Sequence, residues 1–425
     1  MPNRSRYLFL LIGCLTALTT TAQIRIASPY SRFGIGDLAD NNNAWNLGMG
    51  QTSFAIRSPY HVNYGNPASY TAFDSLSFVF EGGFNADIVQ LSSNAQTATS
   101  NYASLGYILF GMPVTRWWRT SLGLIPFSDV GYNVLNLEEY PGIGYVARIY
   151  RGAGGVNRFY WGNGFKLWKS FSIGFNFSYL FGNMEREAVV LFPDSIYYSN
   201  VKVKNNVTIN DIYFNYGIQY HGRLKNNLHL NAGAVFALES KMNAQTDYVA
   251  HTFFIGGSGI EYPKDTLAIG EGYKGKIVIP LMAGFGIGME KTDKWLFSVD
   301  YRWANWKKFT AFDLTDSLVN SQQISAGAEF LPDINSFNNY FKRIQYRIGF
   351  TYKNTYLKLR GKQLHEYAVT VGFGLPLRGV RTAVNVSVQA GIRGTTEADL
   401  IRETYLRFIV GFSIYERWFI KRRYY

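Results

Sequence analysis

Side chains able to do acid–base or metal chemistry are few and scattered in this sequence. The five histidines lie far apart along the chain, and none stands in a recognisable Ser-His-acid grouping; they are His61, His221, His229, His251 and His365. Covalent catalysis requires a nucleophile and a base that meet at one site. Asp37 and Asp40, followed by asparagines, offer oxygen atoms to calcium, but such runs more commonly form polar turns. The spacing therefore predicts no enzyme, no metal site and no cofactor.

The N-terminus has the features of a secretory signal peptide. Arg4 and Arg6 precede an apolar run from Tyr7 to Leu18, and small residues follow up to Ala22. We therefore predict a signal peptide over residues 1–22, whose removal takes away Cys14, the single cysteine. The alternative interpretation is a lipoprotein box that ends at Cys14, with a lipid attached to its thiol.

The rest of the chain shows a period of two. Between Ser170 and Gly182 large apolar side chains alternate with small or polar ones, and the pattern recurs. A strand of a barrel in lipid turns apolar residues outward and polar ones toward the lumen. After residue 22 no run approaches the ~18 apolar residues of a membrane-spanning helix. With 31 Tyr, 32 Phe and 42 Gly, the chain is predicted to be an all-β transmembrane antiparallel barrel.

About fourteen alternating segments follow Leu76, an even number as in bacterial single-chain barrels. They span 76–88, 102–113, 120–131, 157–166, 170–182, 207–221, 227–239, 274–289, 295–304, 321–330, 343–353, 366–376, 382–393 and 404–415. Their connections alternate in length, which predicts short periplasmic turns and long outer loops, among them 133–156, 183–206 and 240–273. The stretch 331–342 is too long for a periplasmic turn, and we interpret it as a small helix.

The residues before the first strand are rich in Gly, Asn and Pro and lack a periodic pattern. A wall of about fourteen strands encloses a lumen that its own side chains do not fill. We therefore predict a hatch, or plug, over residues 23–74, a barrel over 75–415 and a basic periplasmic tail over 416–425.

The chain is basic, with a formal net charge of +13. Many Lys and Arg residues lie at the ends of the predicted strands, where they meet acidic lipid head groups. We therefore expect outer-membrane lipids as partners and no nucleic acid. A soluble β-protein is the alternative fold, but it would expose the broad apolar face of these strands to water.

Several motifs resemble one known family. Gly48–Ala55, the element Asn66-Pro67-Ala68 and the strand Tyr346–Tyr352 resemble the hatch and a wall strand of the FadL family, outer-membrane transporters of long-chain fatty acids and hydrocarbons. The ends, Tyr30–Gly34 and Glu416–Tyr425, resemble a Bacteroidota branch. The resemblance implies a Gram-negative outer membrane and passive transport of a hydrophobic, fatty-acid-like ligand.

Two groups of residues are candidates for such a role. In the hatch, Arg32 offers a cation for a carboxylate beside the apolar Phe33 and Ile35. In the third strand, Pro126 cannot donate to the ladder and Phe127 follows it, and the family has a lateral opening at this strand. The alternatives are that Arg32 pairs with a lumen acid and that Pro126 marks a bulge.

Two other functions remain open from the sequence. The long loops, the stretch 331–342 and the basic tail could be the contact surfaces of a non-transporting subunit in a larger outer-membrane assembly or secretion complex. A general diffusion porin is a third interpretation, which the predicted plug disfavours.

Overall fold

The computed structural model describes residues 26–39, 43–195, 197–316, 318–377 and 382–417. Within them, fourteen antiparallel strands form a closed barrel, as the sequence predicted. The barrel closes because the last strand, β19 (Arg402–Arg417), pairs with the first, β2 (Ser77–Ser92), over the whole length of both. Closure removes the two open edges of the sheet, whose unpaired N–H and C=O groups would have no hydrogen-bond partners in lipid.

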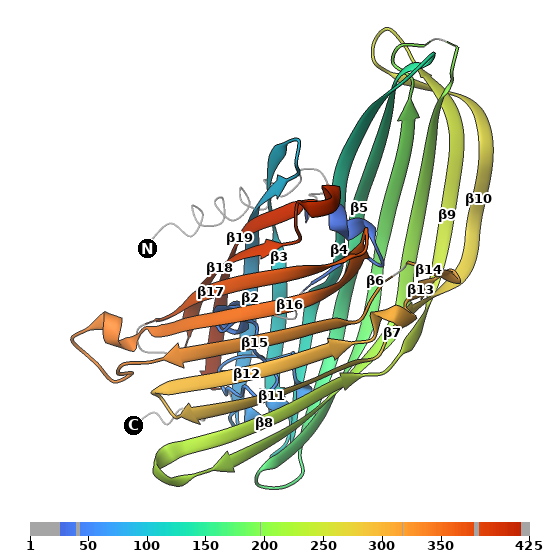
Figure 1. Ribbon diagram of the computed structural model, residues 1–425. Coiled ribbons are helices and arrows are strands. Elements are labelled where there is room, and N and C mark those ends of the chain that lie inside the picture. The colour runs from blue at the N-terminus through green and yellow to red at the C-terminus, as the bar shows by residue number, and fades with distance from the viewer. Residues whose placement is uncertain (1–25, 40–42, 196, 317, 378–381, 418–425) are drawn as a thin grey trace, which may run out of the picture.

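The other wall strands follow in chain order, each beside its predecessor (Figure 1). They are β3 (Thr97–Pro113), β4 (Trp118–Tyr140), β5 (Gly144–Lys166), β6 (Phe171–Leu191), β7 (Asn200–Arg223), β8 (Leu228–Ala237) continued by β9 (Ser240–Ile255), β10 (Glu261–Ile279) continued by β11 (Met282–Lys291), β12 (Trp295–Ala304), β15 (Ser321–Phe330), β16 (Gln345–Leu359), β17 (Lys362–Pro376) and β18 (Ala383–Arg393). Two strands of two residues each, β13 (Thr310–Ala311) and β14 (Leu314–Thr315), lie in the chain segment that connects β12 to β15.

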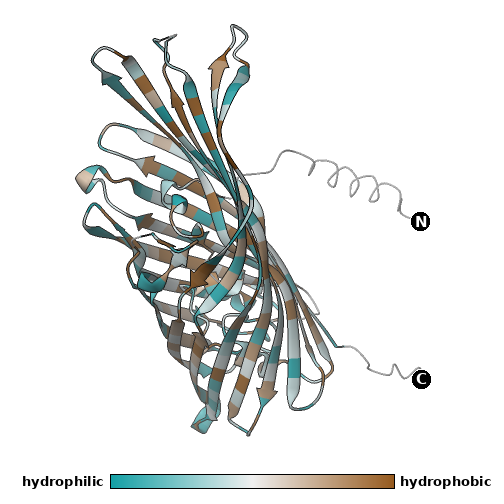
Figure 2. Cartoon of the chain, turned by 90° about the vertical axis from the view of Figure 1, so that its right-hand side faces the viewer, coloured by the Kyte–Doolittle hydropathy of each residue, from teal (hydrophilic) through white to brown (hydrophobic). Residues whose placement is uncertain are grey.

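Side chains alternate across the wall as expected for a barrel in lipid. On β11, Phe285 and Ile287 are 55% and 51% exposed on the outer surface, whereas Gly286 between them faces the plug. Inward-facing polar residues such as Ser178 and Gln219 are fully buried in the lumen. Apolar and polar bands alternate along the strands in Figure 2. The apolar exterior and polar interior define a membrane-spanning wall.

Three of the predicted long loops are wrong. The segments 133–156, 183–206 and 240–273 are instead mostly extended hairpins, whose ladders continue to Tyr140↔Gly144, Val190↔Val201 and Ile255↔Glu261. Beyond the membrane both faces of a strand meet water, so the period of two that marks a spanning strand disappears. These hairpins make one side of the barrel much taller than the side formed by β11 to β18 (Figure 1).

Outside the strands, the helices among the described residues are all short. Their bounds are η1 (Pro29–Arg32), α2 (Ala44–Gly48), η2 (Pro67–Ala72), η3 (Lys225–Asn227), η4 (Trp306–Lys308), η5 (Tyr340–Arg343) and η6 (Glu397–Asp399). Within the predicted helix at 331–342, η5 occupies the end of the stretch. No helix among the described residues is long and apolar enough to cross a membrane. The predicted signal peptide with Cys14, and the part of the basic tail after Arg417, lie outside the described residues.

The segment 43–74 fills the lumen, and we call it the plug. Its helix α2 contacts β16, β17, β18 and β19, whereas η2 contacts β4, β5, β6 and β7 on the opposite wall. Most of its apolar side chains are fully buried, for example Leu47, Phe54 and Tyr70. The plug therefore bridges the barrel from side to side.

Glycines on the wall let the plug backbone approach closely. A Cβ added to Gly349 on β16 would lie 2.0 Å from the backbone nitrogen of Gly50, and one on Gly327 of β15 would lie 2.0 Å from the carbonyl oxygen of Met49. On the other side, a Cβ on Gly217 of β7 would lie 2.1 Å from Oδ1 of Asn66. These contacts require glycine because any side chain would push plug and wall apart.

We predict that Gly349→Val displaces the plug. The added side chain meets backbone atoms that cannot rotate away, and overpacking of this kind costs about 1–3 kcal/mol. The variant should let small hydrophilic solutes pass in a liposome-swelling assay, and its barrel should remain folded by heat-modifiable gel mobility. The control is Gly257→Val, since a Cβ there has nothing within 4 Å. Equal permeability of the two variants would contradict plug docking at Gly349.

Candidate lateral site

The wall ladder is interrupted between β3 and β4. Among the described residues these strands pair from Ile108↔Leu124 to Pro113↔Arg119, although β3 continues beside β2 to Thr97 and β4 continues beside β5 to Tyr140. Beyond Leu124, one edge of β4 is therefore separated from β3. Free backbone groups at such an edge need another partner within a membrane.

The separation begins at the two residues predicted for a lateral opening. Pro126 lacks the N–H that a ladder requires, and the β4–β5 register shifts between Pro126 and Ser128, which places a bulge at Phe127. The bulge also changes which side chains face inward. Arg119, Ser121 and Ile125 are buried before it, and Ser128 and Val130 after it. The geometry therefore includes a bulge together with a separated edge.

The N-terminal segment 26–39 takes the place of β3 along this edge. Its strand β1 (Asp37–Leu38) pairs antiparallel with β4, with Leu38 opposite Ser128. The Ala39 N–H donates to the Phe127 carbonyl at 3.0 Å, and the Ser28 N–H donates to the Gly131 carbonyl at 2.8 Å. The segment thus supplies backbone partners that β3 does not.

Buried charges also fasten this segment to β18 and β19. Arg393 on β18 donates to Asp37 Oδ2 at 2.7 Å through Nη1 and to Ser28 Oγ at 2.7 Å through Nη2. Its Nε donates to Glu403 on β19 at 2.7 Å, and Ser28 Oγ also donates to Glu403, at 2.6 Å. Arg393 and Glu403 are 9% and 2% exposed. One guanidinium therefore holds two carboxylates of different elements, a geometry that Arg favours.

Tyr30 adds a second attachment in η1. Its hydroxyl donates to the Ile401 carbonyl and accepts from the Ile401 N–H at 3.1 Å. Burial raises the pKa of the Tyr30 phenol to about 12, so the hydroxyl keeps its proton at neutral pH. The segment is consequently tied to the loop before β19 as well as to β4.

Three cavities adjoin one another around the segment. An apolar lumen cavity of about 100 Å³ and a polar one of about 110 Å³ share Leu38, Ala39 and Lys353 in their walls. The polar cavity shares Ser28 and Tyr102 with a third, of about 890 Å³, which is also lined by Ile88. Ile88 lies on the outer face of β2 and is 46% exposed. The cavities therefore lie in series from the lumen to the lipid side, and residues 26–39 stand between them.

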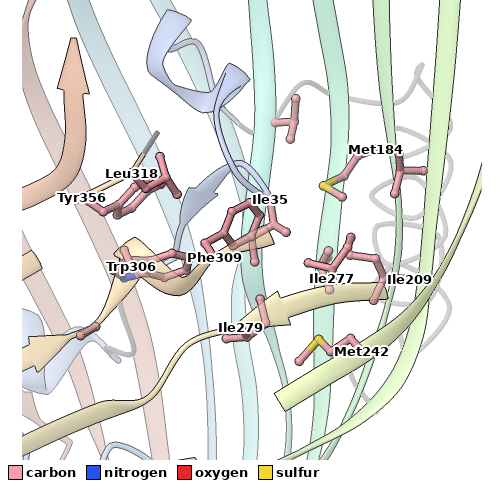
Figure 3. Packing of buried hydrophobic residues seen from close by; sticks show 14 of the residues in the cluster. Ile35, Met184, Ile209, Met242, Ile277, Ile279, Trp306, Phe309, Leu318 and Tyr356 are labelled. Carbon is pink, nitrogen blue, oxygen red and sulfur yellow. The ribbon is translucent and has the colours of Figure 1, made fainter. Parts of the chain in front are cut away.

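The innermost cavity is apolar and lies beside the large cluster drawn in Figure 3. Trp306 packs against Tyr356 with ring centroids 4.8 Å apart, and Phe127 meets Tyr213 at 5.7 Å. In Figure 3, Trp306, Phe309 and Tyr356 face Ile35 from one side, and Met184 and Ile277 lie on the other.

Three basic side chains and several uncharged polar ones also line this cavity; the basic ones are Arg158, Arg302 and Lys353. An aromatic and aliphatic surface beside cations suits an amphiphile with an anionic head.

The three predicted hatch residues lie in different surroundings. Ile35 is 2% exposed within the apolar cluster, and Phe33 packs partly against it. Arg32 is exposed, with its guanidinium 5.1 Å from the Tyr150 ring, and it lines a cavity of about 610 Å³ together with Arg186. The Arg32 guanidinium also lies 6.0 Å from the centroid of the Phe33 ring. The cation therefore stays beside Phe33, whereas Ile35 is buried in the apolar cluster.

The Asn66-Pro67-Ala68 element lies against the wall. Asn66 is fully buried, its Oδ1 accepts from the Ala68 N–H at 3.1 Å, and its Nδ2 donates to the Phe54 carbonyl at 2.8 Å. Pro67 packs over Gly174 of β6. These residues cap η2 and fix the plug to the wall.

Sequence patterns alone do not single out Arg393 and Glu403 as site residues. The alternation of the predicted strand does indicate which way Arg393 faces, because Gln389, Gly391 and Arg393 share its lumen face. The shared contact of Arg393 and Glu403 with Ser28 and Asp37 depends on chain pairing across more than 350 positions, which no local pattern encodes.

The fold and its site define the class: a fourteen-stranded, plugged transmembrane β-barrel whose third strand is separated from its predecessor. The BamG family model matches residues 5–425. The chain therefore belongs to the BamG family. A comparison with curated protein sequences gives no match.

Solved structures share this fold. The P. putida toluene transporter TodX is 15% identical, with a TM-score of 0.60 over 90% of this chain and 100% of that one. A Pseudomonas aeruginosa FadL homologue is 11% identical, with a TM-score of 0.60 over 90% and 99%. The Ralstonia pickettii toluene transporter TbuX is 12% identical, with a TM-score of 0.58 over 88% and 98%. At these identities the likeness to the FadL type is one of fold.

We predict that Arg393→Met releases the N-terminal segment. Two buried carboxylates would lose their cation, and breaking a buried pair costs about 3–5 kcal/mol. Hydrogen exchange at residues 28–39 should rise strongly, and exchange in the plug should not. The matched control is Arg360→Met, because the Arg360–Asp399 pair is exposed on both sides. Unchanged exchange at residues 28–39 in Arg393→Met would show that the arginine does not hold the segment.

Proposed function

We propose that the chain is an outer-membrane barrel of a Gram-negative, Bacteroidota-like bacterium, through which hydrophobic small molecules of the fatty-acid type pass by passive transport. The observation that carries the proposal is the separation of β4 from β3, covered by residues 26–39 and flanked by cavities on both sides. The neighbours with this fold include toluene transporters and a monoaromatic hydrocarbon channel.

The route avoids the plug and the aqueous axis of the barrel. An apolar solute gains little from a water-filled pore, because its favourable environment is the apolar cavity or the bilayer. The solute would rest beside Phe127 and Trp306, pass Leu38 and leave between β3 and β4. The basic residues at the inner cavity hold an anionic head group. Phe127 thus lines the route, and Pro126 interrupts the ladder where the route leaves the wall.

We predict that a disulfide across β1 and β4 blocks transport. Leu38 and Ser128 are opposite each other, and the Ala39 N–H bond to Phe127 makes theirs the non-hydrogen-bonded position, where Cβ atoms are closest. Cells that carry the Leu38→Cys/Ser128→Cys variant should take up labelled long-chain fatty acid when the two cysteines are reduced. Uptake should stop when the disulfide is formed by oxidation. The assay uses a Gram-negative host that lacks its own fatty-acid uptake.

The control pair is Lys166→Cys/Ser172→Cys, since these residues face each other on β5 and β6 within a continuous ladder. Its oxidation should leave uptake unchanged. Equal uptake by the oxidised and reduced Leu38–Ser128 variant would contradict a route through this gap.

The second candidate function is a subunit of a larger outer-membrane assembly. The tall side of the barrel favours it, because residues 261–275 of β10 are exposed on both faces with few exceptions. Exposed Leu267, Ile269 and Tyr273 give this wall an apolar contact surface. Membership of the BamG family is compatible with this role.

We expect Leu267→Asp/Ile269→Asp to decide between the two functions. The tagged chain is isolated from its own outer membrane in mild detergent, and bound proteins and lipids are identified by mass spectrometry. If stoichiometric proteins accompany the native chain and this variant loses them, the wall is a partner surface. Thr266→Asp/Ala268→Asp adds the same charge at the alternate positions and serves as control. A native chain isolated alone with an enriched fatty acid would contradict the assembly role.

A further inference from the structure

Three ligand-type side chains meet at the end of the barrel where the turns are short. His221 on β7, His229 on β8 and Glu290 on β11 each offer one ligand atom, and these atoms all lie within 4.8 Å of one another. His221 and His229 stack with ring centroids 4.7 Å apart and an interplanar angle of 9°. The sequence alone predicts no metal site, because the three residues are separated along the chain.

Strand register explains how they meet. His229 is opposite both Arg223 of β7 and Glu290 of β11, and His221 lies two positions from Arg223. All three residues lie on the lumen face of their strands. His221 is two positions from Gln219, and His229 is two positions from Asn231, and both of these neighbours are fully buried in the lumen. The three ligand residues are half-buried, so a small ion can reach them from the barrel mouth.

The ring nitrogens are arranged to accept an ion. Nδ1 of His221 lies 2.5 Å from Oδ1 of Asn231, a contact in which Nδ1 carries the proton and Nε2 keeps its lone pair. Nδ1 of His229 is buried without a hydrogen-bond partner among the described residues. A buried nitrogen without a partner is costly unless something binds it.

We propose that His221, His229 and Glu290 form a binding site for a divalent transition-metal ion of the zinc type. Two imidazoles and one carboxylate are a donor set that zinc accepts while a further position stays open. This site is independent of the lateral route and does not rest on the proposed function.

Nearby charges set the electrostatics of the site. Arg57 of the plug, Lys166 and Arg223 are cations that act on the trio, and Glu329 adds a negative charge beside Glu290. The Arg57 guanidinium donates to Oε1 of Gln219 at 2.7 Å and to the Thr71 hydroxyl at 2.9 Å. A metal ion would join three wall strands, β7, β8 and β11.

The test uses the full chain, purified in detergent and stripped with a chelator. Competition with a chromophoric chelator should show one Zn²⁺ bound per chain, and Co²⁺ should give visible absorption bands. Zn²⁺ affinity should fall at least about tenfold in His229→Gln and in Glu290→Gln, since each removes a ligand. His251→Gln, on β9 at the far end of the wall, is the matched control and should bind as the native chain does.

Zn²⁺ should also raise the melting temperature of the native barrel and not that of His229→Gln. Heat-modifiable gel mobility in the absence of metal shows that each variant is folded. A native chain that binds no Zn²⁺, or a His229→Gln variant with native affinity, would overturn the proposal.

Discussion

Backbone hydrogen bonding in lipid is the constraint on which the rest of this structure depends. A wall in the membrane must pair its N–H and C=O groups, and the barrel does so through continuous ladders that close from β19 to β2. The ladder between β3 and β4 is short. Pro126 has no N–H, so it cannot donate the next hydrogen bond of this ladder. Residues 26–39 compensate by pairing with β4. The N-terminal segment is therefore part of the wall, although it precedes the plug in the chain.

The plug is held by a different kind of contact. Glycines of β6, β7, β15 and β16 admit its backbone, and lumen side chains complete its hydrogen bonds. Asp300 of β12, for example, accepts from the N–H groups of Ser53 and Phe54 at 2.6 and 2.8 Å. Arg347 of β16 and Trp45 of the plug both donate to Glu329, at 2.7 and 2.8 Å. Because these contacts come from opposite walls, moving the plug would break many of them together.

The sequence predicted the fold well because lipid imposes a simple pattern. Strands such as Leu281–Met289 and Leu406–Ile414 alternate so regularly that their number and their approximate limits could be read directly. The pattern fails beyond the membrane, where residues 261–273 of the predicted loop 240–273 form a strand that is exposed to water on both faces. Pro126 could be recognised because proline acts locally. Arg393, Glu403 and the His221–His229–Glu290 group could not, because cross-strand register and the path of a non-periodic segment bring them together.

These contacts decide which part can move if the barrel transports a solute. Residues 43–74 touch nearly the whole circumference, so their displacement would expose buried polar groups on every side. Residues 26–39 are bound along one strand edge, to Arg393 and Glu403, and at Tyr30 to the loop before β19. Gly34 and Gly36 also form hydrogen bonds with the side chains of Arg186, Asp316 and Tyr356. Release of residues 26–39 breaks these bonds and exposes Ile35, and a hydrophobic solute filling the neighbouring cavities would offset part of that loss. Gating by the N-terminal segment with a fixed plug is thus energetically the smaller change.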